Sequence, residues 1–311
     1  MRIGILGMGG IGGFVGAKLA RAYSKDRDTQ IIFICRGKTK EKILHEGLKF
    51  ISPKETVTVH PDLTSDDPLE IGLLDLLIVA TKSYALADAV RQYQSCLQTE
   101  TVILPLLNGI NARDIIAENT PYDGSNVLHG CIYIASNIDQ PGVVRHLGGP
   151  GKIFFGNASP HDYTWVQRLL EKCGLDTTYT RNIKDILWKK YLFVSPLAAV
   201  TTAHDLTFGE LADSQAHMDL LENLMREVKA LAGGFGVGLK DQDIADALDL
   251  LQGFPDATKT SLQLDVQHQA QHTERDNLIG FVIENGERLG IEVKHYKAMD
   301  NKINEILKNR R

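Results

Sequence analysis

A glycine-rich turn near the start of the chain has the residue types and spacing that bind a pyrophosphate. Residues 7–12 read Gly7-Met8-Gly9-Gly10-Ile11-Gly12, a GxGxxG pattern between a β-rich run and a helical stretch. Gly7 permits a tight turn, Gly9 lets the backbone approach the phosphates, and Gly12 allows close packing of the helix on the strand. The helix N-terminus offers unpaired N–H groups to the anion. We therefore expect a bound dinucleotide, and a glycine-rich turn that binds nothing is the alternative.

The residues after the second expected strand indicate which dinucleotide is bound. An Asp or Glu there would hydrogen-bond the ribose hydroxyls of NAD. Here the strand 31–35 runs into Arg36-Gly37-Lys38. No carboxylate is present in that segment, and a guanidinium can form two hydrogen bonds to a 2′-phosphate. The segment favours NADP(H), and a solvated basic loop is the alternative.

Two more polar segments follow expected parallel strands. Thr81-Lys82-Ser83 comes after the strand that ends at Ala80, and Asn108-Gly109 follows the strand that begins at Thr101. Ligands of open α/β sheets bind beyond the carboxyl ends of the strands, so both segments are candidate ligand contacts. For Lys82 the alternative is a solvated lysine, and Asn108-Gly109 is also a common turn dipeptide.

A lysine near the start of an apolar helical segment is another candidate. Residues 187–200 read LWKKYLFVSPLAAV, and helical periodicity puts Lys190, Val194, Ala198 and Thr201 on one stripe. The ammonium of Lys190 therefore heads an apolar stripe. The alternative is that it extends along this stripe to water, which requires no function.

An acidic segment further along the chain is the last candidate. Ser261 lies in one polar stretch, and Thr273-Glu274-Arg275-Asp276 opens another. The structural alternative is that Thr273 caps a helix while Glu274 and Asp276 complement its dipole. His268 and His272 are four residues apart. No third ligand accompanies this pair, so we expect no metal site.

An N-terminal α/β domain must position the first of these residues. Short β-rich runs alternate with helical stretches over the first third of the chain, which is typical of a doubly wound parallel sheet. The expected strands are 3–6, 30–35, 74–80 and 101–104, with helices at 11–24, 40–46 and 85–96. Further strands are expected at 126–134, 143–146, 153–156 and 177–179, with a helix at 163–173.

The C-terminal part of the chain has a different pattern. After Thr180 no β-rich run appears, and long stretches fit the helical period. We therefore expect two domains, residues 1–180 and residues 181–311, of which the second is all α-helical. The expected helices are 182–203, 211–235, 241–251, 258–271, 274–289 and 296–308. The glycines around Phe235 are expected to end the second of these helices.

The composition favours a protein that acts on small molecules. The chain of 311 residues carries 39 acidic and 34 basic side chains, a net charge of −5, without the basic patch that a nucleic-acid partner needs. No apolar run reaches the roughly 18 residues of a membrane span, and the N-terminus lacks a secretory pattern. The four cysteines are scattered, which favours reduced thiols. We expect a cytoplasmic protein without a membrane or nucleic-acid partner, and a homodimer is left open.

Taken together, these segments resemble the ketopantoate reductase (2-dehydropantoate 2-reductase) family over the whole length of the chain. The matching residues are Gly7 to Gly12, Arg36, Lys82, Asn108-Gly109, Trp188-x-Lys190, Gly209-Glu210-Leu211, Ser261 and Thr273-Glu274-x-Asp276. The resemblance implies a Rossmann-type domain, an α-helical C-terminal domain, and NADPH-dependent reduction of a 2-oxo acid in the cleft between them. The simplest such reaction converts 2-dehydropantoate to pantoate, a step of pantothenate biosynthesis.

The resemblance also implies roles for individual residues. Lys190 is the expected catalytic acid and Glu274 acts with it, Ser261 contacts the substrate, and Asn108 lies beside both nicotinamide and substrate. Lys82 is an expected cofactor contact. Reduction of a ketone requires such an acid. Transfer of a hydride to the ketone carbon leaves negative charge on the oxygen, which an ammonium stabilises and protonates. A carboxylate can orient a substrate hydroxyl and keep the lysine charged.

The chain departs from the family at two positions that bear on the substrate. One and two turns after Lys190 the family usually has asparagines, whereas this chain has Val194 and Ala198. A pocket without these two amides has less means of recognising a polar substrate. The hydroxyls of Ser195 and Thr201 are candidates to compensate for the loss.

Three functions therefore compete. The first is reduction of 2-dehydropantoate, and the second is reduction of a different, less polar 2-oxo acid, which Val194 and Ala198 favour. The third is a regulator that binds NADPH without turnover, against which the retention of Lys190, Glu274 and Ser261 argues.

Overall fold

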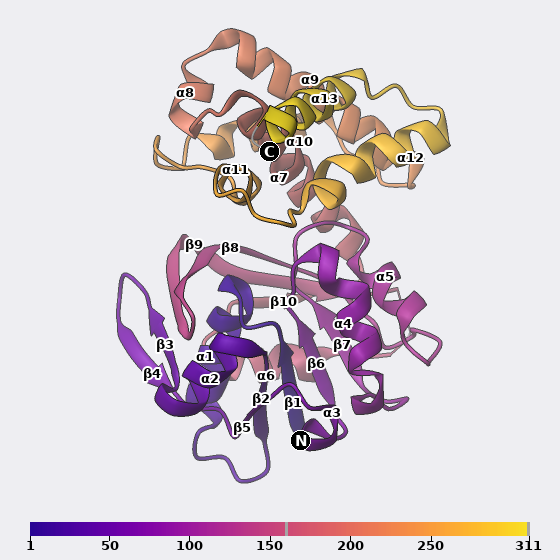
Figure 1. Ribbon diagram of the computed structural model, residues 1–311. Helices are drawn as coiled ribbons and strands as arrows, with labels where there is room; N and C mark the ends of the chain where they lie inside the picture. Colours follow the sequence, from indigo (N-terminus) through magenta and orange to yellow (C-terminus); the bar gives the residue numbers. More distant parts are fainter. Residues whose placement is uncertain (159–160, 310–311) are drawn as a thin grey trace. The chain divides into compact units, whose positions relative to one another are not determined.

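The computed structural model describes residues 1–158 and 161–309 (Figure 1). The chain divides into two compact units. The first comprises Met1–Leu107 and Asn111–Ile183, and the second comprises Asn108–Ile110 together with the chain from Lys184 onward. The three residues 108–110 therefore fold with the second unit, although they follow directly on a strand region of the first. No helix in the described ranges is both long enough and apolar enough to cross a membrane.

A parallel five-stranded sheet forms the centre of the first unit, in the order β5-β2-β1-β6-β7. The strands are β1 (Arg2–Leu6), β2 (Gln30–Ile34), β5 (Leu63–Ser65), β6 (Leu76–Val79) and β7 (Val102–Pro105). Every residue of β6 and all but the first of β2 are buried, as expected for a sheet covered on both faces. The chain order reverses at β1, which lies between β2 and β6. The predicted doubly wound sheet is confirmed.

Helices cover this sheet on both faces. Alternate strand residues such as Ile5 and Phe33 pack in one core with α1 (Gly10–Tyr23), whereas Leu6 and Ile34 belong to a second core with α4 (Leu86–Gln92) and α5 (Ala112–Asn119). The remaining helices of the unit are α2 (Gly37–Glu46), α3 (Pro68–Ile71) and α6 (Thr164–Lys172). The period-2 alternation of the strands thus divides their side chains between two helical layers.

The first unit also contains a second sheet that sequence patterns revealed only in part. Its strands are β3 (Leu48–Ile51), β4 (Thr56–Val59), β8 (His129–Gln140), β9 (Val143–Gly156) and β10 (Thr177–Tyr179), in the order β10-β9-β3-β4 with β8 paired to β9. The expected separate strands 143–146 and 153–156 are wrong, because β9 runs through both. The intervening Gly148-Gly149-Pro150-Gly151 reads as a turn, but the β8–β9 pairing passes through it with shifts of register.

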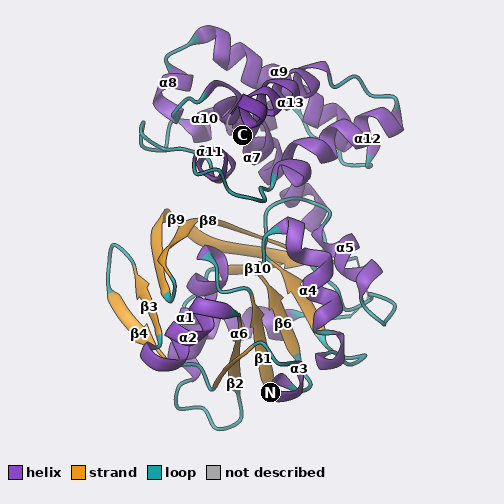
Figure 2. Cartoon of the chain, viewed as in Figure 1, coloured by secondary structure: helices purple, strands orange, loops and turns teal. Residues whose placement is uncertain are grey.

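The second unit is helical, and the part of it that the structure describes contains no strand (Figure 2). Its helices are α7 (Ile183–His204), α8 (Phe208–Ala212), α9 (Gln215–Gly234), α10 (Asp241–Leu251), α11 (Ser261–Gln267), α12 (Phe281–Leu289) and α13 (Lys294–Asn309). They enclose one apolar core that includes Leu192, Leu224 and Tyr296. The expectation of an all-helical C-terminal region is confirmed.

Two expected helices of this unit are divided in the structure. The stretch 211–235 contains the end of α8, which a capping box of Thr207 and Glu210 starts at Phe208, and then α9, which starts at Gln215. The stretch 274–289 begins with a π-helical turn over Asp276–Gly280 before α12. The glycine cluster does end α9, whose last residue is Gly234.

Candidate functional site

The glycine-rich turn lies at the carboxyl end of β1 and starts α1. Gly7 has φ +94°, and its N–H donates to the carbonyl of Ile34 at the end of β2. A Cβ at Gly12 would overlap the carbonyl oxygen of Gly7, so close packing requires glycine there. At Gly9 the nearest heavy atom to an added Cβ is 4.0 Å away, so the backbone there is open. Met8 is buried in the apolar core and Ile11 packs against it, so only their backbones face the turn.

This turn has the features that a dinucleotide pyrophosphate needs. Gly9 is the N-cap of α1 and supplies no side-chain cap, so the helix N-terminus keeps its donors for an anion. The turn joins the point where the strand order reverses, which is where open α/β sheets bind ligands. Next to it, at the end of β6, the buried Oγ1 of Thr81 has no hydrogen-bond partner among the described residues. The residues present therefore fit the phosphates of a dinucleotide.

Basic residues follow the carboxyl end of β2, and an acid that sequence patterns did not single out lies next to them. Arg36 is exposed and is the N-cap of α2, and Lys40 lies one turn further along that helix. Lys40 Nζ pairs with Asp66 Oδ1 at 2.5 Å. Asp66 directly follows β5, which runs parallel to β2 with Ser65 opposite Ile34. No carboxylate directly follows β2 in sequence, as expected, but Asp66 at the end of the neighbouring strand β5 places one beside the carboxyl end of β2.

The charges at this strand end influence one another. The hydrogen bond from Lys40 is the main reason that the pKa of the Asp66 carboxyl lies below its usual value, and the charge of Arg36 lowers this pKa further. Burial raises the pKa of the neighbouring Cys35 thiol to about 12, so this cysteine carries no charge. The local field therefore comes from the cations of this segment, with the Asp66 carboxylate opposing them.

Lys82 lies at the carboxyl end of β6, where it precedes a short 3₁₀ turn over Ser83–Ala85. Its side chain is exposed. It comes directly after Thr81, whose backbone nitrogen approaches the position of Gly7. The structure thus places Lys82 on the same sheet edge as the glycine-rich turn.

In the helical unit, α7 brings Lys190 to Asn108. Lys190 Nζ donates to Asn108 Oδ1 at 2.9 Å. The helix is fixed there by the buried side chains of Trp188 and Tyr191, whose rings meet edge to face. Lys190 itself is half-buried. Of the predicted substrate and catalytic residues, these two are in direct contact although 82 positions separate them in sequence.

Glu274 and Ser261 belong to the same unit. Glu274 is buried, with 5% of its surface exposed, and its carbonyl accepts from the N–H of Leu278 in the turn that follows. Ser261 is the exposed first residue of α11, whose N-cap is Thr260. A buried carboxylate needs compensating donors or cations, so the burial of Glu274 singles it out from the many surface acids.

The hydroxyls that could have replaced the family asparagines are already engaged. Ser195 Oγ donates to the carbonyl of Leu278 at 2.6 Å and lies 2.5 Å from the Tyr296 hydroxyl. Thr201 Oγ1 donates to the carbonyl of Leu197 at 2.8 Å and bonds Thr260. Both hydroxyls are fully buried, so the expectation that they compensate for Val194 and Ala198 is wrong.

Sequence patterns missed one residue beside this pair. Asn277 Nδ2 donates to the backbone carbonyl of Asn108 at 2.7 Å. Asn277 lies next to Asp276, in the segment for which a capped helix start was the structural alternative to a functional role. In the sequence, only its position directly after the Thr273-Glu274-x-Asp276 motif distinguishes Asn277, and an asparagine beside a motif is too common to indicate a function.

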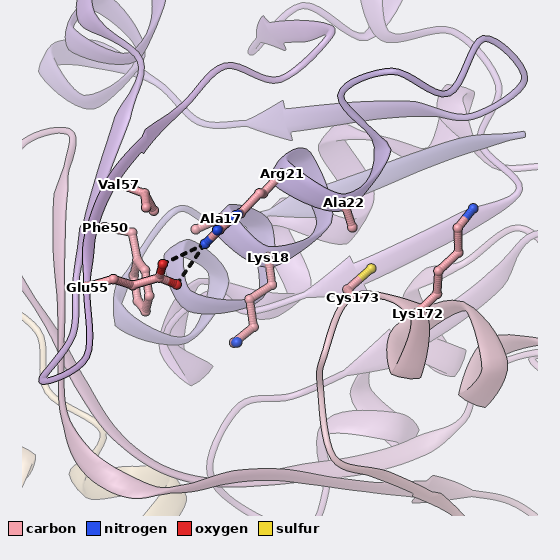
Figure 3. A pocket seen from close by; sticks show the side chains of 9 residues that line it. All are labelled: Ala17, Lys18, Arg21, Ala22, Phe50, Glu55, Val57, Lys172 and Cys173. Atoms are coloured by element: carbon pink, nitrogen blue, oxygen red, sulfur yellow. Dashed lines mark hydrogen bonds and ion pairs between the residues drawn. The ribbon is translucent and has the colours of Figure 1, made fainter.

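Two cavities lie outside the predicted site. One, of about 320 Å³, is bordered by α1, β3 and the end of α6, and Figure 3 shows Arg21 reaching Glu55 there, with an N–O distance of 2.7 Å. Burial raises the pKa of its Cys173 thiol to about 11. The other, of about 260 Å³, is bordered by His204, Gln263 and Lys302 in the helical unit. Neither cavity is bordered by a residue of the predicted site.

Comparison with known proteins gives a consistent family. A model of the family described as ketopantoate reductase PanE/ApbA matches residues 3–160, and the model of its C-terminal part matches residues 182–306. An uncharacterized oxidoreductase of Bacillus subtilis, YkpB, is 26% identical over 294 residues, 94% of each chain. A 2-dehydropantoate 2-reductase of Halobacterium salinarum is 28% identical over 291 residues, 91% of each chain.

Solved structures share the fold. A PanE/ApbA family ketopantoate reductase of Ralstonia eutropha superposes with a TM-score of 0.89 at 23% identity and covers 99% of both chains. A ternary structure of D-mandelate dehydrogenase with NADH and anilino(oxo)acetate gives a TM-score of 0.88 at 20% identity, again over 99% of both chains. One fold thus serves proteins with different named substrates.

Proposed function

The chain belongs to the ketopantoate reductase family, as its motifs indicated, and on this premise we propose that it reduces a 2-oxo acid with NADPH, most simply 2-dehydropantoate. The observation that carries the proposal is the 2.9 Å hydrogen bond from Lys190 Nζ to Asn108 Oδ1, in the same unit as the buried Glu274. In this proposal, residues 1–180 form the domain that binds the dinucleotide, and residues 181–311 form the domain that binds the substrate.

In this mechanism Lys190 is the acid. When bound, the reduced nicotinamide supplies a hydride to the ketone carbon. The ammonium of Lys190 stabilises the negative charge that develops on the ketone oxygen and then donates a proton to it. An ammonium has three N–H donors, and the bond to Asn108 uses one of them to orient Lys190. Glu274 accepts from a substrate hydroxyl and favours the charged form of the lysine, and Ser261 donates to the substrate.

For the cofactor we propose NADP(H) over NAD(H). Gly7 to Gly12 hold the pyrophosphate at the N-terminus of α1, and Lys82 contributes from the end of β6. Arg36 meets the 2′-phosphate, because it is exposed at the carboxyl end of β2 where the adenosine ribose binds in this fold. Asp66 opposes this preference through its pairing with Lys40, so discrimination against NADH is expected to be incomplete.

A less polar substrate is the second candidate, and the composition of α7 favours it. Val194 is half-buried, Ala198 is 2% exposed, and the hydroxyls of Ser195 and Thr201 are committed to the core. This stripe therefore offers no amide or free hydroxyl to a hydroxylated substrate. The mandelate dehydrogenase neighbour, which holds an anilino(oxo)acetate, is an example of this fold with a ligand that carries an aromatic ring.

Single-turnover oxidation of bound NADPH by individual 2-oxo acids tests these alternatives. Oxidation by 2-dehydropantoate alone supports the simplest function, whereas faster oxidation by apolar oxo acids supports the second. A regulator that senses NADPH would bind it without oxidation by any oxo acid.

We place the reaction in the cytoplasm, because Cys35, Cys96 and Cys173 are free thiols.

A further inference from the structure

We infer that Asn277 is a positioning residue that holds Asn108 where its amide oxygen can orient Lys190. The inference rests on the proposed role of Lys190. Two consecutive hydrogen bonds carry it: Asn277 Nδ2 donates to the carbonyl of Asn108 at 2.7 Å, and Lys190 Nζ donates to Asn108 Oδ1 at 2.9 Å. Asn277 thus acts on the backbone of Asn108 and leaves its side chain to the lysine.

The residue after Asn108 is adapted to this contact. Gly109 has φ +107°, which glycine adopts far more readily than other residues. A Cβ at this position would overlap the side-chain amide of Asn277, its three nearest atoms being Nδ2, Oδ1 and Cγ. A glycine is therefore required for two reasons, the backbone conformation and the close approach of the Asn277 amide.

The π-helical turn explains how Asn277 is held in place. A π-turn disturbs the regular pairing of the helix, and such turns are frequent at functional sites. Here the Tyr191 hydroxyl lies 3.0 Å from the carbonyl of Asn277 and 2.9 Å from that of Leu278, and Ser195 Oγ donates to the latter at 2.6 Å. Burial raises the pKa of the Tyr191 phenol, which keeps its proton available to donate. The backbone that carries Asn277 is therefore bonded to two residues of α7, the helix of Lys190.

The arrangement forms a closed path between two points of α7. Lys190 bonds Asn108, Asn108 bonds Asn277, and the Asn277 carbonyl bonds Tyr191, the neighbour of Lys190. The segment 108–110 enters this unit from the end of β7, and Asn277 holds it through its backbone. Without Asn277, the Asn108 amide oxygen would no longer be restricted to one position, and the bond through which it orients the lysine ammonium would be weakened.

Activity with the best 2-oxo acid tests the inference through a double-mutant cycle. We expect Asn277→Ala to lower kcat about tenfold with little change in KM, because a small misplacement of a catalytic group reduces the rate without weakening binding. In an Asn108→Ala background the same substitution should change kcat less than twofold, since no amide oxygen is left to position. A purely structural role would lower kcat by the same factor in both backgrounds, and that result would overturn the inference.

Two further variants separate positioning from loss of structure. Asn277→Asp keeps the shape and removes the N–H donor, so it should lower kcat at least as much as Asn277→Ala. Asn285→Ala is a matched control, because Asn285 Nδ2 donates to the carbonyl of Phe281 within α12 at 2.9 Å. It should leave kcat unchanged. If thermal denaturation shows that the Asn277→Ala variant is unfolded, the kcat of the Asn277→Asp variant is compared with the wild type instead.

Backbone order parameters from NMR relaxation distinguish failure of this inference from failure of the proposed function. The order parameters of residues 108–110 should be lower in Asn277→Ala and Asn277→Asp than in the wild type, whether or not the protein turns over an oxo acid. Lower order parameters without any reductase activity would reject the proposed function and support the contact. Unchanged order parameters at 108–110 in both variants would overturn the inference even in an active enzyme.

Discussion

Lys189 and Lys190 are consecutive residues of α7 whose ammonium groups have different partners. Lys190 Nζ donates to Asn108 Oδ1 at 2.9 Å, whereas Lys189 Nζ pairs with Asp243 Oδ1 at 2.8 Å. Lys189 is also more than half exposed, with 55% of its side-chain surface accessible. Successive helical residues point about 100° apart, so the two lysines lie on different faces of the helix.

This difference gives the first prediction. Lys190→Ala should lower kcat by about 10² to 10⁴ and leave NADPH affinity near normal, because the substitution removes the proton donor and not a cofactor contact. Lys189→Ala is the control and should change kcat little, because the ammonium of Lys189 pairs with Asp243 on a different face of the helix. Steady-state kinetics and NADPH titration measure both. Equal losses of kcat in the two variants would remove Lys190 from its proposed role.

The second prediction concerns Arg36. Arg36→Ala should weaken NADPH by about 1.5 to 3 kcal/mol and NADH much less, because only NADPH carries the 2′-phosphate that a guanidinium can bind. Dissociation constants of the two cofactors from calorimetry check this. Wild-type protein that binds NADH as tightly as NADPH would contradict the assignment of Arg36.

The third prediction concerns Asp66. Asp66→Asn should strengthen NADPH binding about three- to tenfold and hardly change NADH binding, because the carboxylate that pairs with Lys40 also repels a phosphate nearby. Glu46→Gln, which removes the partner of Lys42 on the same helix, is the matched control and should change neither affinity. If Asp66→Asn weakened both cofactors equally, Asp66 would be a ribose contact instead.

The fourth prediction concerns the substrate stripe of α7. The double substitution Val194→Asn with Ala198→Asn should raise kcat/KM for 2-dehydropantoate relative to apolar 2-oxo acids, because it supplies the two missing amides. In the wild type, kcat/KM for apolar 2-oxo acids should at least equal that for 2-dehydropantoate. A clear wild-type preference for 2-dehydropantoate would refute the altered pocket and favour the simplest function.

Local sequence patterns predicted most elements of the fold. Alternating β-rich and helical segments predicted the parallel sheet, because its buried strands are continuous apolar runs such as Ile31–Ile34. The same reasoning failed for β9, where Gly148 to Gly151 are typical of a turn. The glycines fit a turn as well as an irregular strand, and only the pairing with β8 shows that the strand continues through them with shifts of register.

In the functional site, too, local sequence patterns identified individual residues but not the contacts that depend on the fold. Lys190 and Asn108 were identified from their motifs, but their contact depends on how residues 108–110 fold with the helical unit. Asp66 was missed because strand pairing, and not sequence position, brings it beside Arg36. Asn277 was missed for a related reason, since its importance lies in a hydrogen bond across 169 positions of the chain.

Single-turnover oxidation of bound NADPH shows whether the protein reduces a 2-oxo acid and whether Lys190 is the acid. The protein is loaded with one equivalent of NADPH, mixed with each 2-oxo acid, and followed by the loss of dihydronicotinamide absorbance. We expect complete oxidation by at least one 2-oxo acid, at a rate that falls about 10² to 10⁴ in Lys190→Ala and stays near wild type in Lys189→Ala. NADPH that binds tightly but stays reduced with every 2-oxo acid, 2-dehydropantoate included, would contradict the proposed function.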